Sequence, residues 1–225
     1  MKLYKKMKLF YDLLSQPSRT LFIYLKLNKI PFEACPVALR KGEHLTEDFK
    51  EKCSKFGKVP FIHDGDFRLT ESVAIVRYLS EKYNVNEPLY PKDAQLRGKI
   101  DEYLEWQHHN IRANCSMYFI MKCIEPLFKE VPDKKLAAFK KRMEKSLVDI
   151  QELFLKDQEY LAGNSFTVAD IFAATEIDQL RATGYDPKDN RPVLAAWLDR
   201  VKSNCEPYYS ETHEIVERFA KKSKL

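Results

Sequence analysis

Ser15 lies in the segment YDLLSQPSRT, residues 11–20, where an apolar run meets small polar residues. A serine shortly before Pro17 is typical of a helix N-cap, whose side chain accepts a hydrogen bond from the first turn. The hydroxyl could instead perform chemistry. No G-x-S-x-G elbow surrounds it, which disfavours a hydrolase-type nucleophile and leaves hydrogen-bond donation as its chemical role. The pattern around Ser15 therefore leaves two functions open, a cap and a donor.

Glu71 and Ser72 form a second polar pair, at the start of the helical pattern in TESVAIVRYL. The free N–H groups at a helix start, together with the Ser72 hydroxyl, can hold a carboxylate. Glu71 supplies a negative charge that can pair with an ammonium group. This segment can therefore hold a carboxylate and an ammonium group.

The spacing of the histidines and cysteines does not match a metal site. His108 and His109 are adjacent, hence on different helix faces, and they have no acidic or thiol partner at ligand spacing. The five cysteines are an odd number and include no C-x-x-C pair, which argues against both a zinc ribbon and a disulfide framework. We expect reduced thiols and no metal.

The composition is typical of a soluble globular protein. The chain has 225 residues, 44% of them hydrophobic, which is enough for the core of one large domain or two small ones. Its 38 basic and 33 acidic residues are interspersed, and the resulting charge of +5 suits small anionic ligands better than nucleic acid. No apolar run approaches the roughly 18 residues of a membrane span, and the N-terminal apolar run is too short for a signal peptide, so we expect no membrane partner. The interspersed charges likewise lead us to expect no nucleic-acid partner.

The location indicated by these features is cytoplasmic. The last three residues, Ser223, Lys224 and Leu225, match the peroxisomal import address, so import into peroxisomes is an alternative location.

The chain has two halves with different secondary-structure patterns. Residues 1–83 mix short strands with helices, residues 84–93 contain two prolines and are typical of a linker, and residues 94–225 are almost wholly helical. The elements expected in the first half are a strand at 8–13, a helix at 15–28, an edge strand around Pro36, a short helix at 46–53, a hairpin around Asp64-Gly65 and a helix from Ser72. This order, β-α-β-α-β-β-α with a mixed four-stranded sheet, is the thioredoxin-like α/β layout, which presents its reactive group where the first strand meets the first helix.

Long amphipathic helices are expected in the second half. The spacing predicts one continuous helix over 99–119 and another whose apolar residues recur at steps of three and four from Leu136 to Phe154. Thr167 and Asp170 form a capping box in which Asp takes the place of Glu.

Several segments together carry a family resemblance. They are YDLLSQPSR, RKGEHL, KVPFIHDGDFRLTESVAIVRYL, LYP, DEYLEWQH and FTVADIFAATEI. In order and spacing they resemble a theta-class cytosolic glutathione S-transferase of the insect type. The resemblance implies a glutathione-binding domain at 1–83, an all-helical domain at 94–225 that forms the second-substrate pocket, and a homodimer. It also implies glutathione as co-substrate, conjugation to small hydrophobic electrophiles such as alkyl or aryl halides, and reduction of organic hydroperoxides.

The resemblance also gives roles to site residues. Glu71 and Ser72 would hold the γ-glutamyl end of glutathione. Val59 would pair through its main chain with the glutathione backbone, because Pro60 is expected to be cis. His44 and Lys58 would lie near the glycine carboxylate.

Ser15 is the catalytic residue that the resemblance implies, as a hydrogen-bond donor to the glutathione sulfur. Tyr11 is the alternative, because other transferase classes place their tyrosine in the first strand. A third function, thiol oxidoreductase, is disfavoured because position 15 is not a cysteine. Arg112 is assigned equally to the second-substrate pocket or to a solvent- or dimer-facing position.

Two departures from the family pattern affect these expectations. The residues before Lys58 read CSKFG where members more often have Asn-Pro, so the loop near the glycine end of glutathione is expected to differ. The chain also ends earlier than the vertebrate theta members, which predicts a more open second-substrate pocket. The alternative function is a non-catalytic interaction module of the same fold.

Overall fold

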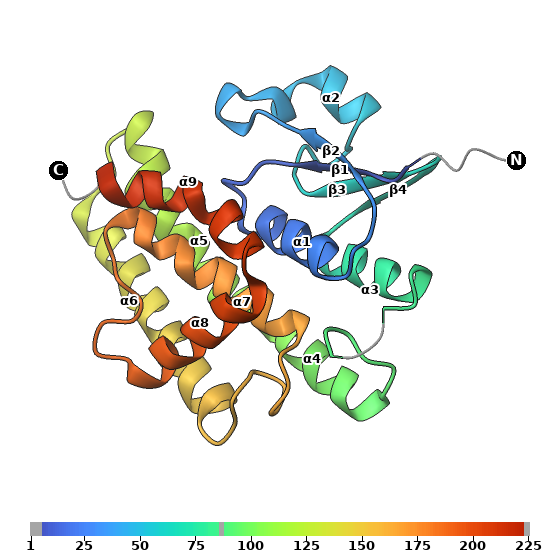
Figure 1. Cartoon of the computed structure of the whole chain (residues 1–225). Coiled ribbons are helices and arrows are strands. Elements are labelled where there is room, and N and C mark those ends of the chain that lie inside the picture. Colours follow the sequence, from blue (N-terminus) through green and yellow to red (C-terminus); the bar gives the residue numbers. More distant parts are fainter. Residues whose placement is uncertain (1–5, 86–87, 223–225) are drawn as a thin grey trace, which may run out of the picture. The chain divides into compact units, whose positions relative to one another are not determined.

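The computed structural model describes residues 6–85 and 88–222, which form two compact units, Met1–Val85 and Asn86–Leu225. The N-terminal unit is an α/β layer structure and the second unit is helical (Figure 1). In this part of the chain no helix has both the length and the apolar character needed to cross a membrane.

The N-terminal unit is built on a four-stranded sheet in the order β2-β1-β3-β4. The strands are β1 (Lys8–Tyr11), β2 (Glu33–Pro36), β3 (Phe61–Asp64) and β4 (Phe67–Thr70), and the helices are α1 (Gln16–Leu27), α2 (Glu47–Lys52) and α3 (Ser72–Lys82). β1 is parallel to β2 and antiparallel to β3, and β3 is antiparallel to β4. The sheet is therefore mixed, and the predicted thioredoxin-like order of elements is confirmed.

Strand alternation divides the side chains of the sheet between its two faces. Phe10 stacks on Phe61, with ring centroids 4.4 Å apart, on the face that α2 covers, whereas the ring of Tyr11 packs 5.6 Å from Phe22 of α1. Figure 1 shows α1 and α3 together on this second face. As the sequence predicts, Pro36 lies on an edge strand, and β3 and β4 form a hairpin around Gly65, which has a φ of 65°.

The second unit consists of helices with short 3-10 and π segments between them. The helices are α4 (Ala94–Trp106), α5 (Ile111–Phe119), α6 (Asp133–Ile150), α7 (Val168–Asp178), α8 (Pro192–Cys205) and α9 (Tyr208–Lys222). All eleven residues of α7 are buried, so this helix is the centre of the unit.

The single helix that the sequence predicts over 99–119 is wrong, because the chain forms two helices there. A 3-10 turn at Gln107–His109 follows α4, and Asn110 leaves the helical region with φ −116° and ψ −101°. The Asn110 side-chain amide donates to the carbonyl of Trp106 at 2.8 Å, which satisfies a carbonyl at the end of α4. At the Trp106 carbonyl, the Asn110 side chain therefore takes the place of the main-chain N–H that would continue the helix. The apolar pattern of the sequence nevertheless continues unbroken through Asn110.

The start of α7 is held by the predicted capping box of Thr167 and Asp170. The Asp170 carboxylate is completely buried and accepts hydrogen bonds from the Thr167 main chain at 2.9 Å and the Thr167 hydroxyl at 3.0 Å. It also accepts from the Leu161 main chain and the Trp197 indole, each at 2.9 Å. One carboxylate thereby connects α7, α8 and the segment before α7.

Replacing Asp170 with alanine should lower the free energy of unfolding by about 3 kcal/mol or more, because four buried donors lose a charged acceptor. Chemical denaturation measures the change. Asp149→Ala is the control, since Asp149 pairs with the exposed Lys145 at 2.8 Å and such surface pairs contribute below about 1 kcal/mol. Equal losses in the two variants would contradict this account of α7.

Candidate active site

Ser15 occupies the N-cap position of α1, but its side chain does not act as a cap. Its φ of −80° and ψ of 122° are those of an N-cap residue, yet within residues 6–85 the hydroxyl makes no capping hydrogen bond. Instead it donates to the carbonyl oxygen of Val59 at 3.4 Å, 44 residues further along the chain. This long hydrogen bond leaves the hydroxyl half-buried and able to turn toward another acceptor.

The loop that carries Ser15 is held by two residues to which the sequence analysis gave no role. The Asp12 carboxylate accepts from the main-chain N–H of Leu14 at 2.8 Å and of Leu39 at 3.1 Å. Arg19 is fully buried and donates from Nη1 to the carbonyl of Leu13 at 2.8 Å. A charged Arg19 within the apolar helix pattern was the available signal, since buried charged groups need specific partners.

The start of α1 is electropositive. Its first turn contains no acidic residue, and the Ser15 side chain accepts no capping hydrogen bond from it. Neither a first-turn carboxylate nor a capping hydroxyl therefore offsets the positive end of the α1 dipole in the described chain. A negative charge placed beside Ser15 is stabilised by this helix end.

The loop before Val59 is fixed from two sides. Burial lowers the pKa of His63, and since a carbonyl oxygen can only accept, the neutral ring donates from Nε2 to the carbonyl of Cys53 at 3.0 Å. Gly57 has a φ of 57°, and a Cβ there would lie 2.8 Å from the His44 carbonyl oxygen, which only glycine avoids. The peptide bond between Val59 and Pro60 is cis, as the resemblance implied.

His44 and Lys58 are brought near each other by that contact, because Gly57 packs on His44 and precedes Lys58. His44 lies in the 3-10 turn Glu43–Leu45, with its Nδ1 buried and without a hydrogen bond to any residue the structure describes. Lys58 is exposed and, over the same residues, makes no ion pair. Residues 6–85 and 88–222 therefore use neither the charge of Lys58 nor the hydrogen-bonding capacity of His44 Nδ1.

Glu71 has a strained backbone at the start of α3. Its φ of 66° and ψ of 109° are rare for a residue with a side chain and cost about 1–3 kcal/mol. Its side chain is exposed, and in the described chain it neither caps α3 nor forms an ion pair. Ser72 begins α3, whose first turn contains no acidic residue. Strain of this kind is typical of functional sites, and here it occurs at a helix N-terminus that can receive a carboxylate.

The sheet brings Ser15, Val59 and Glu71 to one end. Phe61 pairs with Phe10 of β1 on one side and with Thr70 of β4 on the other. The residues after β1, before β3 and after β4 therefore lie at the same end of the sheet. Six of the predicted site residues, namely Ser15, His44, Lys58, Val59, Glu71 and Ser72, thus belong to segments of one unit.

Arg112 lies in the other unit, on α5, where it forms an ion pair with the buried Glu176 of α7. Its predicted role in the second-substrate pocket stays a prediction. The role of Tyr11 as the alternative to Ser15 also stays a prediction, and its ring packs on α1.

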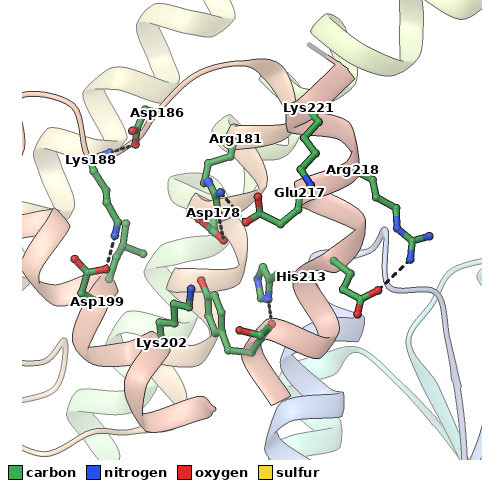
Figure 2. A pocket seen from close by; sticks show the side chains of 14 residues that line it. Asp178, Arg181, Asp186, Lys188, Asp199, Lys202, His213, Glu217, Arg218 and Lys221 are labelled. Atoms are coloured by element: carbon green, nitrogen blue, oxygen red, sulfur yellow. Dashed lines mark hydrogen bonds and ion pairs between the residues drawn. The ribbon is translucent and has the colours of Figure 1, made fainter. Parts of the chain in front are cut away.

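A cavity of about 520 Å³ lies in the helical unit, lined in part by α8 and α9 (Figure 2). Its walls are charged and largely paired internally: Arg181 contacts Asp178 at 3.4 Å and Glu217 at 2.6 Å, and Lys188 pairs with Asp199. Such polar walls do not suit an apolar electrophile. Among the described residues no group of three or more His, Cys, Asp and Glu side chains is placed to hold a metal ion.

Known proteins are similar to this chain over nearly its whole length. The glutathione S-transferase N-terminal domain family matches residues 9–88, and the C-terminal domain family matches residues 114–204. Bovine glutathione S-transferase theta-1 is 40% identical over 213 residues, which cover 93% of this chain and 88% of the relative.

Solved structures agree with these relatives. The crystal structure of human glutathione transferase theta-2 in complex with glutathione and an unknown ligand is 37% identical, with a TM-score of 0.91, covering 97% of this chain and 90% of that one. A human theta-class transferase in complex with the glutathione conjugate of 1-menaphthyl sulfate is 38% identical, with a TM-score of 0.87, covering 97% and 92%. The mammalian relatives do not support the insect-type expectation, and a Bombyx mori glutathione transferase is only 25% identical, with a TM-score of 0.80, covering 96% and 97%.

Proposed function

Because this chain belongs to the theta class of the glutathione S-transferases, a family of enzymes, we propose that it binds glutathione, holds it as a thiolate beside Ser15 and transfers it to small electrophiles. The observation that carries this proposal is the Ser15 hydroxyl, which contacts the Val59 carbonyl at 3.4 Å rather than capping α1. A hydroxyl that the helix does not use is available to a sulfur atom.

The ends of glutathione are matched by separate groups of the site. The γ-glutamyl carboxylate is held by Ser72 and the first N–H groups of α3, and its ammonium pairs with Glu71. The main chain of Val59 pairs with the peptide backbone of glutathione. His44 and Lys58, both without a partner among the described residues, neutralise the glycine carboxylate. The assignment is supported by the charges, since two positive regions and one negative residue face a ligand with two carboxylates and one ammonium.

The second substrate is a small hydrophobic electrophile, such as an alkyl or aryl halide, and organic hydroperoxides are a further proposed substrate. Arg112 is the proposed polar group for this substrate. It forms an ion pair with the buried Glu176 while its own side chain stays partly exposed. The alternative, a non-catalytic interaction module, has no support from the comparisons, whose relatives are named as transferases.

The proposed location is cytoplasmic, with peroxisomal import as the alternative. Ser223, Lys224 and Leu225 lie outside the described residues. Fluorescence microscopy of the chain with a fluorescent label at its N-terminus, with and without these three residues as its last ones, tests the import signal. A diffuse distribution in both cases would exclude it.

The functional assembly that we propose is a homodimer. Light scattering at micromolar concentration should give about twice the 26.5 kDa of one chain. A mass near that of one chain would contradict the dimer without affecting the assignment of the glutathione site.

Glu71→Gln and Ser72→Ala should each weaken glutathione binding more than they slow turnover at saturating glutathione. Both residues hold the γ-glutamyl end equally in the ground and transition states, so their loss raises KM for glutathione and leaves kcat nearly unchanged. We expect about a 10-fold weaker affinity for each, as for the loss of a hydrogen bond to a charged group. Calorimetric titration measures it, and an unchanged affinity in both variants would contradict the placement of the γ-glutamyl end.

Ser15→Ala should slow conjugation at pH 7 by about 10- to 100-fold while glutathione affinity changes little. A free thiol titrates near pKa ~8.5, and lowering that pKa by about two units takes about 2.7 kcal/mol. A hydrogen bond to a charged acceptor provides about 1.5–3 kcal/mol, and the α1 end adds about 0.3–1 kcal/mol. The pKa of the bound thiol should therefore rise in the variant, and a higher pH should restore much of the rate.

Tyr11→Phe is the matched control for the Ser15 variant, since it removes the other hydroxyl considered. It should leave the pH profile of conjugation unchanged. If Tyr11→Phe abolishes turnover and Ser15→Ala has no effect on rate or pH profile, the assignment of Ser15 is wrong.

A further inference from the structure

Five cations of α6 gather on one solvent-exposed face of the helix. They are Lys134, Lys135, Lys141, Arg142 and Lys145. At about 100° per residue they fall within an arc of about 120°, opposite the buried Met143, Leu147 and Ile150. The linear sequence obscures this face because acidic residues are interspersed, whereas the helical period moves Asp133 and Glu144 away from it.

Most of this positive charge is not neutralised by the residues that the structure describes. Lys145 pairs with Asp149 at 2.8 Å, and the Arg142 guanidinium lies 5.8 Å from the centre of the Phe139 ring. In the part of the chain that the structure describes, Lys134, Lys135, Lys141 and Arg142 form no ion pair. The face therefore keeps a net attraction for an anionic surface.

Two large exposed apolar side chains come shortly before α6 in the sequence. Leu127 is 73% exposed and Phe128 is 82% exposed, more than the other large hydrophobic residues that are exposed in the described chain. Leu127 ends the 3-10 turn Glu125–Leu127 and Phe128 follows it, so the two lie seven and six residues before Lys134. Adjacent exposed Leu and Phe side chains form an apolar patch of the kind that marks contact with a membrane or with another protein.

We propose that the α6 cations and the Leu127–Phe128 pair form a docking surface for an anionic lipid bilayer. Lysines and arginines bind anionic headgroups, while leucine and phenylalanine enter the boundary with the acyl chains. Nucleic acid would satisfy the cations but would leave this apolar pair in water. The sequence expectation of no membrane partner rested on the absence of a spanning run, and peripheral docking requires no span.

Sedimentation with sucrose-loaded vesicles tests the proposal on the full-length protein. Vesicles of phosphatidylcholine alone are compared with vesicles that contain roughly one third phosphatidylserine, at about 0.1 M salt. The protein should bind the anionic vesicles and not the neutral ones, and about 0.5 M salt should release it because the attraction is screened.

Two variants remove the two parts of the docking surface. Lys141→Glu/Arg142→Glu should lower the vesicle partition coefficient by at least about tenfold, since each cation near such a membrane contributes about a fivefold factor. Leu127→Ser/Phe128→Ser should lower it by about tenfold through lost apolar burial. None of these residues belongs to the proposed glutathione site, so conjugation of a water-soluble electrophile should stay unchanged and reports correct folding.

Matched controls change the same properties elsewhere. Lys156→Glu/Lys202→Glu makes the same change in net charge at exposed lysines outside α6, and Leu153→Ser removes a leucine that is 64% exposed. Both should keep the partition coefficient within about twofold of the original.

Three results would overturn the proposal. They are no binding to anionic vesicles, an equal loss in the control and the α6 variants, and full binding by the Leu127→Ser/Phe128→Ser variant. The last result, together with competition by short duplex DNA, would assign the α6 cations to a general polyanion surface instead.

Discussion

The antiparallel pairing of β3 with both β1 and β4 is the constraint on which the proposed active site depends. Phe61 lies opposite Phe10 in one neighbour and Thr70 in the other, so the segments that carry Ser15, Val59 and Glu71 all meet one end of the sheet. A shift of one residue would turn every side chain of β3 to the other face and separate Phe61 from Phe10. The core packing of the unit and the positions of its functional groups are therefore fixed by the same register.

Around that end of the sheet, the proposed site is held by groups to which the proposal gives no chemical role. Asp12 and Arg19 fix the loop before Ser15, while His63 and Gly57 fix the segment before Val59. Stabilising a thiolate requires a donor whose position is set before the ligand arrives, because any reordering would consume part of the gain. The Ser15 hydroxyl meets this requirement, since its loop is fixed but its hydrogen bond to Val59 is long enough to exchange.

Local patterns carried most of what could be predicted from the sequence. The edge position of Pro36 follows from its missing N–H, and the capping box of Thr167 and Asp170 follows from spacing. The contact of Gly57 with the His44 carbonyl could not be predicted, because it joins residues 13 apart through a backbone conformation. The break at Asn110 was missed because one side-chain hydrogen bond outweighed a continuous apolar pattern. Sequence patterns describe single elements well, whereas contacts between loops depend on the assembled fold.

The central claim is that the Ser15 hydroxyl keeps bound glutathione ionised. The most direct measurement is an ultraviolet absorbance titration of the thiolate in the binary complex with glutathione, performed on the natural protein and on Ser15→Ala without a second substrate. The account predicts a thiol pKa of about 6.5 in the natural protein and a value at least about one unit higher in the variant, for which one unit corresponds to about 1.4 kcal/mol. Identical pKa values in the two complexes, with glutathione bound equally well, would contradict it.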